Sequence, residues 1–427
     1  MRKVKEKSYE YDGFVLHTIA TDQFKNGYLE VNFRQDISEC TPSKRNMLGV
    51  LMKYSTSSCK TNRQLKIACE NLYDISFSQG TSRVGYNLIT SFSLDFLHPK
   101  YVSEKSYIKK AFHFFFDALE HPNIENGKWD EQSFDIIKEL ILSNIDLYKE
   151  RPTSYAMVES KKRLFQDSCT GQRIIGTKET VEALTPESVA QDYQEMFEKS
   201  ICEIILVGDF DMDEMAKLIN QCFYKPCIVE KTIESIVPNK IIPYKEEEQS
   251  SSYTQTQIVQ YYISEPLTKR ERDYVAPVFQ QITGLGSLSD KLGYYLRMKN
   301  SLCYSYYSTF AMGDSYFVIS TGIKEENKEK ALKCFHQVME EMKKGIISKE
   351  DLETKKTKIL TNVKMAMDNI YGIAENCYNH HVLDHPSFEN TLKEIPTVTI
   401  KELKSLAMKL HKSYTFILKE GEAHERD

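Results

Sequence analysis

The sequence predicts an α+β protein made of two tandem homologous domains, each an antiparallel or mixed sheet covered by helices. Strand-like runs are grouped with helical runs in each half of the chain. The order of these runs in the first half returns in the second half at an offset of about 215 residues, which indicates a tandem duplication. A polar, proline-bearing stretch separates the halves. We therefore expect domains at 1–228 and 253–427, joined by a linker at 229–252.

In the first half, residues 11–33 alternate as paired strands do, with a turn at 24–27, and predict a hairpin. A helix is expected to begin at Thr41-Pro42 and to bury Met47, Leu48 and Leu51. The remaining elements are a helix at 62–73, strands within 74–97, helices at 109–119, 134–149, 154–165 and 179–199, a buried strand at 201–207, and a helix ending at 223.

The second half repeats this order. The helix at 352–368 matches the one at 134–149, and the strand at 414–418 matches the strand at 201–207. The other expected elements are a strand at 253–263, a helix at 270–282, a strand at 316–321 and helices at 328–344 and 400–410.

Composition sets broad limits on the function. The chain has 427 residues, 41% of them hydrophobic and 27% charged, which is typical of a soluble protein with more than one core. The net charge of -5 argues against nucleic-acid binding. We expect no membrane span and a cytoplasmic location, because no apolar run approaches the length of a span or a signal peptide. The ten cysteines include no Cys-x-x-Cys, so they are expected to be buried, reduced thiols.

Residues 284–308 join a loop, a helix, a turn and a strand without a break. Gly284 and Gly286 permit backbone angles that other residues avoid, and apolar residues at helical spacing follow them. Asn300-Ser301 should end that helix, and an aromatic strand should begin at Tyr304. Arg297 at the helix end and Tyr304 at the strand start are then expected to face one cavity. An ordinary helix end with a surface arginine remains the alternative.

This stretch resembles the segment of the insulinase and mitochondrial-processing-peptidase family that leads from a glycine-containing loop into Arg-x-x-x-Gly-Leu-x-Tyr. Arg297 and Tyr304 have the spacing of that pattern, Leu302 is kept, and Ser301 replaces its glycine. The family cuts peptides with zinc. The resemblance implies paired α+β domains forming half of a clam shell around a peptide-holding chamber. It also implies that Arg297 and Tyr304 contact substrate, and that the loop at Gly284 and Gly286 contacts the peptide or a partner.

In active members of that family the first helix carries His-x-x-Glu-His. Two histidines four residues apart hold zinc on one helix face, and the glutamate activates the bound water. The corresponding positions here are Asn46, Gly49 and Val50, none of which can do this. The third ligand, a glutamate in active members, falls near Ser143-Asn144, with Glu139 close by.

We therefore expect an inactive subunit without a metal or cofactor of its own, which pairs with a zinc-bearing homologue and helps to process peptides. Whether the partner is a homologue or a second copy is left open. One alternative is a non-catalytic scaffold that binds proteins. Another is an independent metallopeptidase that uses His381, Asp384 and His385, where the histidines are four residues apart but Pro386 should end the helix.

Overall fold

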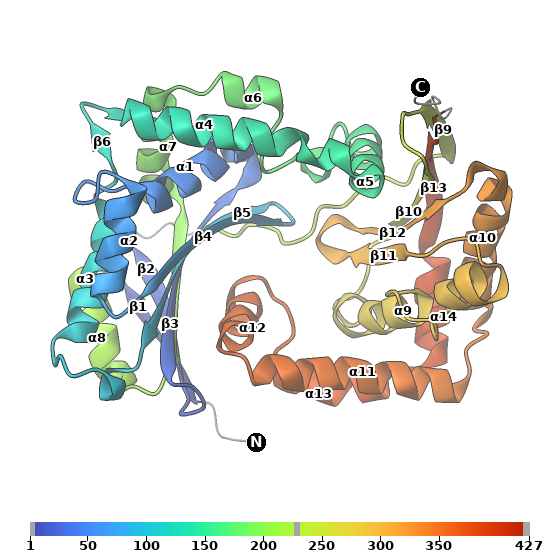
Figure 1. Ribbon diagram of the computed structural model, residues 1–427. Coiled ribbons are helices and arrows are strands. Elements are labelled where there is room, and N and C mark those ends of the chain that lie inside the picture. Colours follow the sequence, from blue (N-terminus) through green and yellow to red (C-terminus); the bar gives the residue numbers. More distant parts are fainter. Residues whose placement is uncertain (1–4, 226–230, 422–427) are drawn as a thin grey trace. The chain divides into compact units, whose positions relative to one another are not determined.

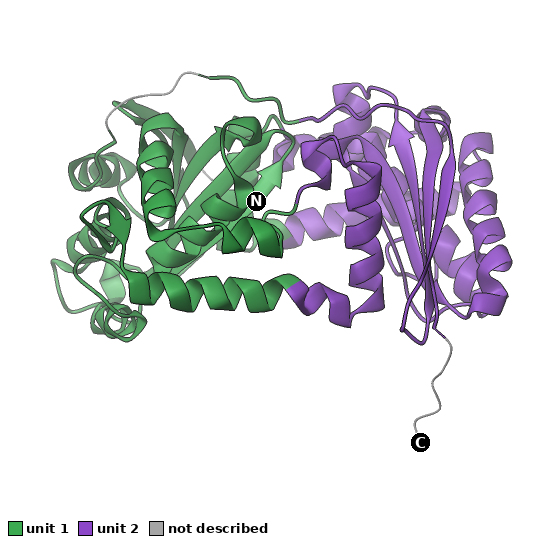
Figure 2. Cartoon of the chain, turned by 90° about the horizontal axis from the view of Figure 1, so that it is seen from above, with its two compact units in different colours: residues 1–145, 173–235, 366–384 green, residues 146–172, 236–365, 385–427 purple. Residues whose placement is uncertain are grey.

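The computed structural model describes residues 5–225 and 231–421 and confirms the α+β fold class. The chain forms two compact units, and each unit draws on both halves of the sequence (Figure 2). Unit 1 comprises residues 1–145, 173–235 and 366–384, and unit 2 comprises 146–172, 236–365 and 385–427. Within the described ranges, no helix is both long and apolar enough to cross a membrane.

Unit 1 contains a six-stranded mixed sheet in the order β1-β2-β8-β3-β5-β4 (Figure 1). The expected hairpin at 11–33 is wrong, because β8 lies between the two strands, parallel to β2 and antiparallel to β3. β2 forms its hairpin with β1 instead. The strands are β1 (Lys5–Tyr11), β2 (Phe14–Ala20), β3 (Asn26–Asp36), β4 (Ser76–Val84), β5 (Asn87–Leu97) and β8 (Ile201–Gly208).

Side chains alternate along these strands, so alternate residues build one apolar face, which the local helices cover. Inside this core, the fully buried guanidinium of Arg45 on α1 donates to Asp192 on α7, with Nε 3.1 Å from Oδ2, and this pair ties the two helices together. The helices are α1 (Pro42–Tyr54), α2 (Asn62–Asn71), α3 (Tyr107–Glu120), α4 (Glu131–Asp146), α6 (Lys178–Glu182), α7 (Pro186–Lys199) and α8 (Met212–Cys222), and a small hairpin is formed by β6 (Ile124–Glu125) and β7 (Lys128–Trp129).

The other face of this sheet is polar and is covered by α12 (Ile370–Val382), a helix from the second half of the sequence (Figure 1). Beneath it, Arg34 on β3 donates to Glu203 on β8, with Nε 3.1 Å from Oε1. The Tyr371 ring packs edge-on against Tyr28, with 5.1 Å between centroids. Polar groups on this face therefore need partners within the interface, because α12 shields them from water.

Unit 2 contains a five-stranded mixed sheet in the order β11-β12-β10-β13-β9. The last part of the expected linker, Lys245–Ser250, forms β9 and pairs with β13 in parallel. Its charged residues suit an edge strand, and Glu248 on β9 forms an ion pair with Lys328, 2.7 Å apart. The remaining strands are β10 (Thr256–Ser264), β11 (Tyr306–Ala311), β12 (Tyr316–Ile323) and β13 (Leu410–Lys419).

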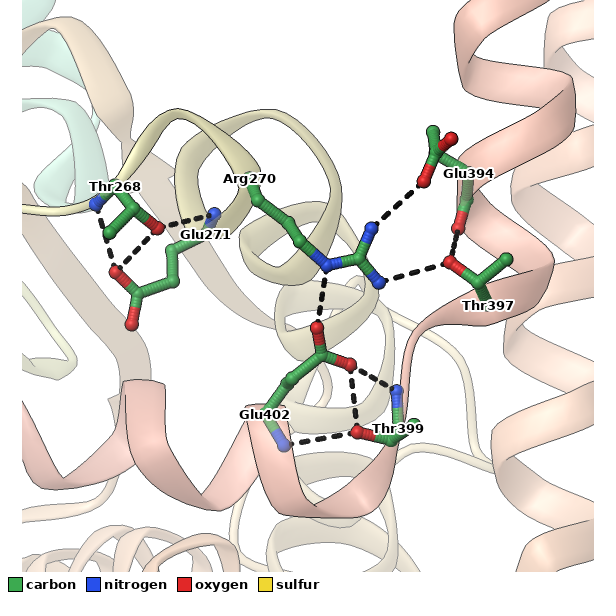
Figure 3. Close-up of polar contacts among 7 residues, drawn as sticks. All are labelled: Thr268, Arg270, Glu271, Glu394, Thr397, Thr399 and Glu402. Atoms are coloured by element: carbon green, nitrogen blue, oxygen red, sulfur yellow. Dashed lines mark hydrogen bonds and ion pairs between the residues drawn. The ribbon is translucent and has the colours of Figure 1, made fainter.

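The helices of unit 2 are linked by a polar network centred on Arg270 (Figure 3). Its guanidinium donates to Glu402 (2.6 Å), to Glu394 (2.9 Å) and to Thr397 (3.0 Å). These contacts join the helix that begins beside Arg270 to the two helices that contain Glu394 and Glu402. The helices are α5 (Pro152–Leu164), α9 (Ala276–Thr283), α10 (Lys328–Lys344), α11 (Lys349–Met367), α13 (Phe388–Glu394) and α14 (Ile400–Met408).

α5, from the first half of the sequence, covers the second face of the unit 2 sheet. That face is largely apolar, and Ala156 of α5 packs in one cluster with Val259, Tyr261 and Phe416. Ser160 of α5 also lies 3.0 Å from the Tyr261 hydroxyl. Each unit thus contains one helix from the other half of the sequence. The expected ranges 1–228 and 253–427 follow the sequence repeat, whereas the compact units do not.

Glu30, on β3 under α12, provides a test of this arrangement. Burial raises the pKa of its carboxyl from 4.5 to about 7, although the Tyr28 hydroxyl donates to it. A raised carboxyl pKa lowers the free energy of unfolding as pH rises from 4.5 to 7, because the folded state holds the proton longer than the unfolded state. Glu30→Gln should therefore be more stable than the parent protein at pH 8, by about 1 to 3 kcal/mol, and nearly equal to it at pH 4.

Chemical denaturation of both proteins at the two pH values measures this difference. The exposed Glu10→Gln serves as the control and should change stability little at either pH. Equal stability of Glu30→Gln and the parent at pH 8 would show that α12 does not shield Glu30 from water.

Candidate functional site

The first candidate site is the helix α1, at the positions where active relatives hold zinc. Asn46 and Val50 are half-buried, and Gly49 is buried. Val50 lines a groove of about 610 Å³ on unit 1, together with Glu139 and Ser143 of α4. Glu139 and Ser143, which lie where the third zinc ligand was expected, therefore line the same groove as Val50. The other lining residues are Lys53, Tyr54, Asn62, Lys66, Ile136, Ile137 and Leu140.

Among the residues that line this groove, Glu139 is the one side chain of a type that commonly binds zinc. A structural or catalytic zinc needs three or four such ligands. The residues that line this groove therefore cannot hold zinc in the manner of active relatives. Most of the other lining side chains are apolar, and two are lysines.

Gly49 allows α1 to lie close to the strands β4 and β5. A Cβ atom at this position would lie 3.0 Å from Gln79 Oε1 and 3.5 Å from Thr81 Oγ1. Both of these oxygens are buried, and neither has a hydrogen-bond partner among the residues that the structure describes. A side chain at position 49 would require Gln79 to shift by a few tenths of an ångström, so Gly49 gives α1 its close fit against these strands.

The second candidate site is the pair Arg297 and Tyr304, on unit 2. The Arg297 guanidinium lies 5.5 Å from the centroid of the Tyr304 ring, so the two side chains lie next to each other. Arg297 belongs to a π-helical turn, Gly293–Lys299, and Tyr304 precedes β11 by two residues instead of opening it. Tyr304 is 87% exposed, so its hydroxyl is available to donate to a bound molecule.

Ser301, at the glycine position of the family pattern, has φ of +51°. A left-handed conformation is favourable for glycine and costs about 1 kcal/mol or more for other residues, which explains a glycine in the pattern. The turn is nevertheless closed, because Ser301 N donates to Arg297 O (3.1 Å) and Leu302 N donates to Leu296 O (2.8 Å). The replacement therefore leaves Arg297 and Tyr304 in register.

The two glycines of the preceding loop serve different purposes. Gly284 has an extended backbone, but a Cβ atom there would lie 2.6 Å from Leu292 Cδ1, so packing excludes a side chain. Gly286 has open space around it and a φ of +83°, so its backbone conformation favours glycine.

Asp290, which sequence reasoning missed, organises this loop. It is 1% exposed and accepts backbone hydrogen bonds from Leu285 (3.0 Å), Ser287 (2.9 Å) and Gly293 (2.7 Å). The Tyr306 hydroxyl also donates to it, at 2.7 Å. A Ser-x-x-Asp spacing after a glycine pair is the one signal that pointed to such a side-chain-to-backbone turn.

Lys355, on α11, completes the loop. It is 3% exposed, its Nζ donates to Ser289 Oγ at 2.9 Å, and burial lowers the pKa of its amine. The loop is thus fixed by buried polar contacts before any ligand binds.

The alternative metal site at His381, Asp384 and His385 is not a helical pair. α12 ends at Val382, and Asp384 has a left-handed φ of +57°, so His385 does not share a helix face with His381. Pro386 is the physical reason, because it disfavours helix in the residue before it. His381 instead stacks on His17, with 4.7 Å between ring centroids, and lies 3.3 Å from Glu6.

An α+β homologue of a zinc peptidase that lacks the zinc ligands is thus the class that the fold and the α1 helix define. Comparisons with known proteins agree. Residues 183–359 match the family model described as "Peptidase M16 inactive domain". The chain is 24% identical over 436 residues to a "Probable inactive metalloprotease YmfF" of Bacillus subtilis, covering 98% of this chain and 99% of that protein. It is 21% identical over 390 residues to a "Non-peptidase homolog YmxG" of Helicobacter pylori, covering 88% of this chain and 84% of that protein.

Solved structures show the same fold. A conserved protein from Enterococcus faecalis superposes with a TM-score of 0.91 at 23% identity, covering 99% of this chain and all of that one. The periplasmic protease PqqL of Escherichia coli superposes with a TM-score of 0.73 at 11% identity, over 99% of this chain but 47% of its own length. The resemblance to the insulinase-type, or M16, peptidases is confirmed, and the relatives that the chain matches along most of its length carry names that describe them as inactive or non-peptidase.

The role of Asp290 can be tested by Asp290→Asn. An asparagine keeps the shape but replaces one accepting oxygen by a donor that would face backbone N–H groups, so at least one buried donor loses its partner. We expect a loss of about 1 to 3 kcal/mol in the free energy of unfolding and faster proteolysis within residues 284–293. The exposed Asp368→Asn is the control. Unchanged stability together with unchanged loop cleavage would contradict the role of Asp290.

Proposed function

We propose that this chain is a non-catalytic subunit that pairs with a zinc-bearing homologue and helps to hold unfolded peptides for cleavage. The observation that carries the proposal is an asymmetry. The zinc helix α1 lacks its ligands, whereas the Arg297–Tyr304 pair is in place, with Tyr304 87% exposed. General loss of function would be expected to remove both.

The Arg297–Tyr304 pair suits a role at another subunit's reacting centre. A guanidinium and a phenol hydroxyl both donate hydrogen bonds, and neither needs a metal of its own. Placed at the carbonyl under attack, they would stabilise the oxyanion that develops on it. The rigid loop held by Asp290 would keep Arg297 in position, since Gly293, to which Asp290 is bonded, opens the same helical turn.

Unit 1 offers a surface for an extended peptide. β4 is the terminal strand of its sheet, and α1, which lines the groove with Val50 and Tyr54, packs against it. A terminal strand can pair its backbone with an extended peptide, and an apolar groove beside it can accept a side chain. This supports peptide holding without cleavage.

The comparisons support a pairing with a homologue. The chain covers 47% of PqqL, so that protease contains about two such lengths in one polypeptide. A second copy of the present chain would lack the same ligands at 46, 49 and 50, and two such copies could not assemble the zinc site. The zinc and its ligands therefore belong to a different chain.

The proposal places the protein in the cytoplasm. Its support is that the nine cysteines in the described part of the chain form no disulfide with one another, and all of them are buried or half-buried.

The test uses the purified complex with a zinc-bearing homologue from the same cell and an unfolded peptide as substrate. We expect Arg297→Ala and Tyr304→Phe to lower kcat/KM by roughly 30- to 1,000-fold, since loss of one oxyanion donor costs about 2 to 4 kcal/mol in the barrier. Assembly, measured by sedimentation, should be unchanged because the two side chains would contact substrate and not the subunit interface.

Two matched controls lie beside these residues. Lys299→Ala removes a cation from the same helical turn, and Tyr307→Phe removes an exposed hydroxyl from β11. Both should leave the rate within about twofold, as expected of surface substitutions away from the reacting centre. If all four variants cleave like the parent, or if Arg297→Ala and Tyr304→Phe abolish assembly, the chain is a protein-binding scaffold instead.

A further inference from the structure

A cluster of metal-ligating side chains lies at the end of α12, on unit 1, apart from the residues of α1. Cys377 and His381 come from α12, and Glu6 comes from β1. Each offers one ligand atom, and the three atoms all lie within 4.8 Å of one another. His381 Nε2 lies 3.3 Å from Glu6 Oε2. Ligands of one zinc ion lie roughly 3 to 4 Å apart, so a small side-chain movement would close the set.

The two helical ligands are well placed for a shared ion. Residues four apart on a helix lie on one face, so Cys377 and His381 present the same i, i+4 arrangement that a zinc helix uses. Cys377 is 4% exposed, so its sulfur is held by packing. Glu6 is about half-exposed, and its carboxylate is free to turn towards an ion.

His17 fixes the orientation of the His381 ring. The two rings stack at an interplanar angle of 12°, and His17 Nδ1 lies 2.8 Å from Ser8 Oγ. A ligating histidine held in one orientation by its neighbours is typical of metal sites.

We propose that Glu6, Cys377 and His381 bind one divalent transition-metal ion of the Zn²⁺ type, with water at the fourth position. A thiolate, an imidazole and a carboxylate together suit Zn²⁺ or Co²⁺, whereas Mg²⁺ and Ca²⁺ prefer oxygen ligands alone. The site departs from the sequence-based expectation of a chain without metal. It is independent of the proposed function, since none of its ligands lies on α1 or in the loop at 284–304.

The ion would fasten α12 to β1. α12 comes from the second half of the sequence and covers a polar sheet face, whereas β1 is the terminal strand of that sheet. The Cys377 thiol must give up its proton to bind the metal as a thiolate. Binding then forms the metal–sulfur bond and releases one proton to solvent. Because the bound ion stabilises only the folded arrangement, it should raise the melting temperature.

The experiment titrates Co²⁺ into the full-length protein after treatment with a chelator. We expect a thiolate-to-cobalt charge-transfer band that saturates at one Co²⁺ per chain, and Zn²⁺ should abolish it by competition. Cys377→Ser should remove the band, and His381→Ala and Glu6→Gln should weaken Co²⁺ binding by at least about tenfold. Zn²⁺ should raise the melting temperature of the parent and leave that of Cys377→Ser unchanged.

Matched controls separate this site from other thiols and histidines. Cys334→Ser removes a buried thiol on α10, and His380→Ala removes the histidine next to His381 on α12. Both should keep the band. No saturable band with the parent, or a band that survives Cys377→Ser, would overturn the proposal. Glu6→Gln alters an exposed side chain and should fold normally, so unchanged affinity in that variant would remove Glu6 from the ligand set.

Discussion

Each sheet has two faces, and the helices next to it in sequence cover only one of them. In unit 2 the second face is apolar, and α5 from the first half of the chain covers it with Ala156 against Tyr261 and Phe416. In unit 1 the second face is covered by α12 from the second half. Each half by itself would leave a sheet face exposed to water, so both halves are needed to complete either unit. This gives a structural reason for retaining the whole tandem repeat in a chain whose zinc helix has lost its ligands.

Different interactions hold α5 and α12, the two helices that each cover a sheet from the other half of the sequence. α5 buries apolar side chains, which is favourable without precise pairing. α12 instead covers Glu30, Arg34 and Glu203, and such groups must be paired when water is removed. The Arg34–Glu203 contact meets part of this need, yet Glu203 Oε2 and the Tyr378 hydroxyl have no hydrogen-bond partner among the described residues. The α12 interface is therefore the less favourable of the two, and a metal-mediated link from Cys377 and His381 to β1 would strengthen it where the helix ends.

Much of the fold could be predicted from sequence because it depends on local periodicity. The repeat, most helices and the spacing of Arg297 and Tyr304 are local features, and the resemblance to the M16 peptidases followed from them. The hairpin at 11–33 failed because β8, which lies between its strands, comes from residues 201–208. The exchange of α5 and α12 and the grouping of Glu6 with Cys377 were missed for the same reason. They depend on which distant segments meet, and periodicity along the chain does not encode that.

Besides lacking zinc ligands, α1 packs closely against its sheet at Gly49. With glycine at position 49, α1 lies close to β4 and β5, and the space of a catalytic glutamate is partly filled by Gln79 and Thr81. Replacing Asn46, Gly49 and Val50 with the residues of an active enzyme would therefore require the Gln79 side chain to shift, and it would still need a third ligand from α4. Close packing resists such a change, because a shift of even part of an ångström is felt throughout a core. The groove at Val50 is thus better suited to holding a side chain than to binding zinc, because Glu139 is the one residue of a zinc-binding type among those that line it.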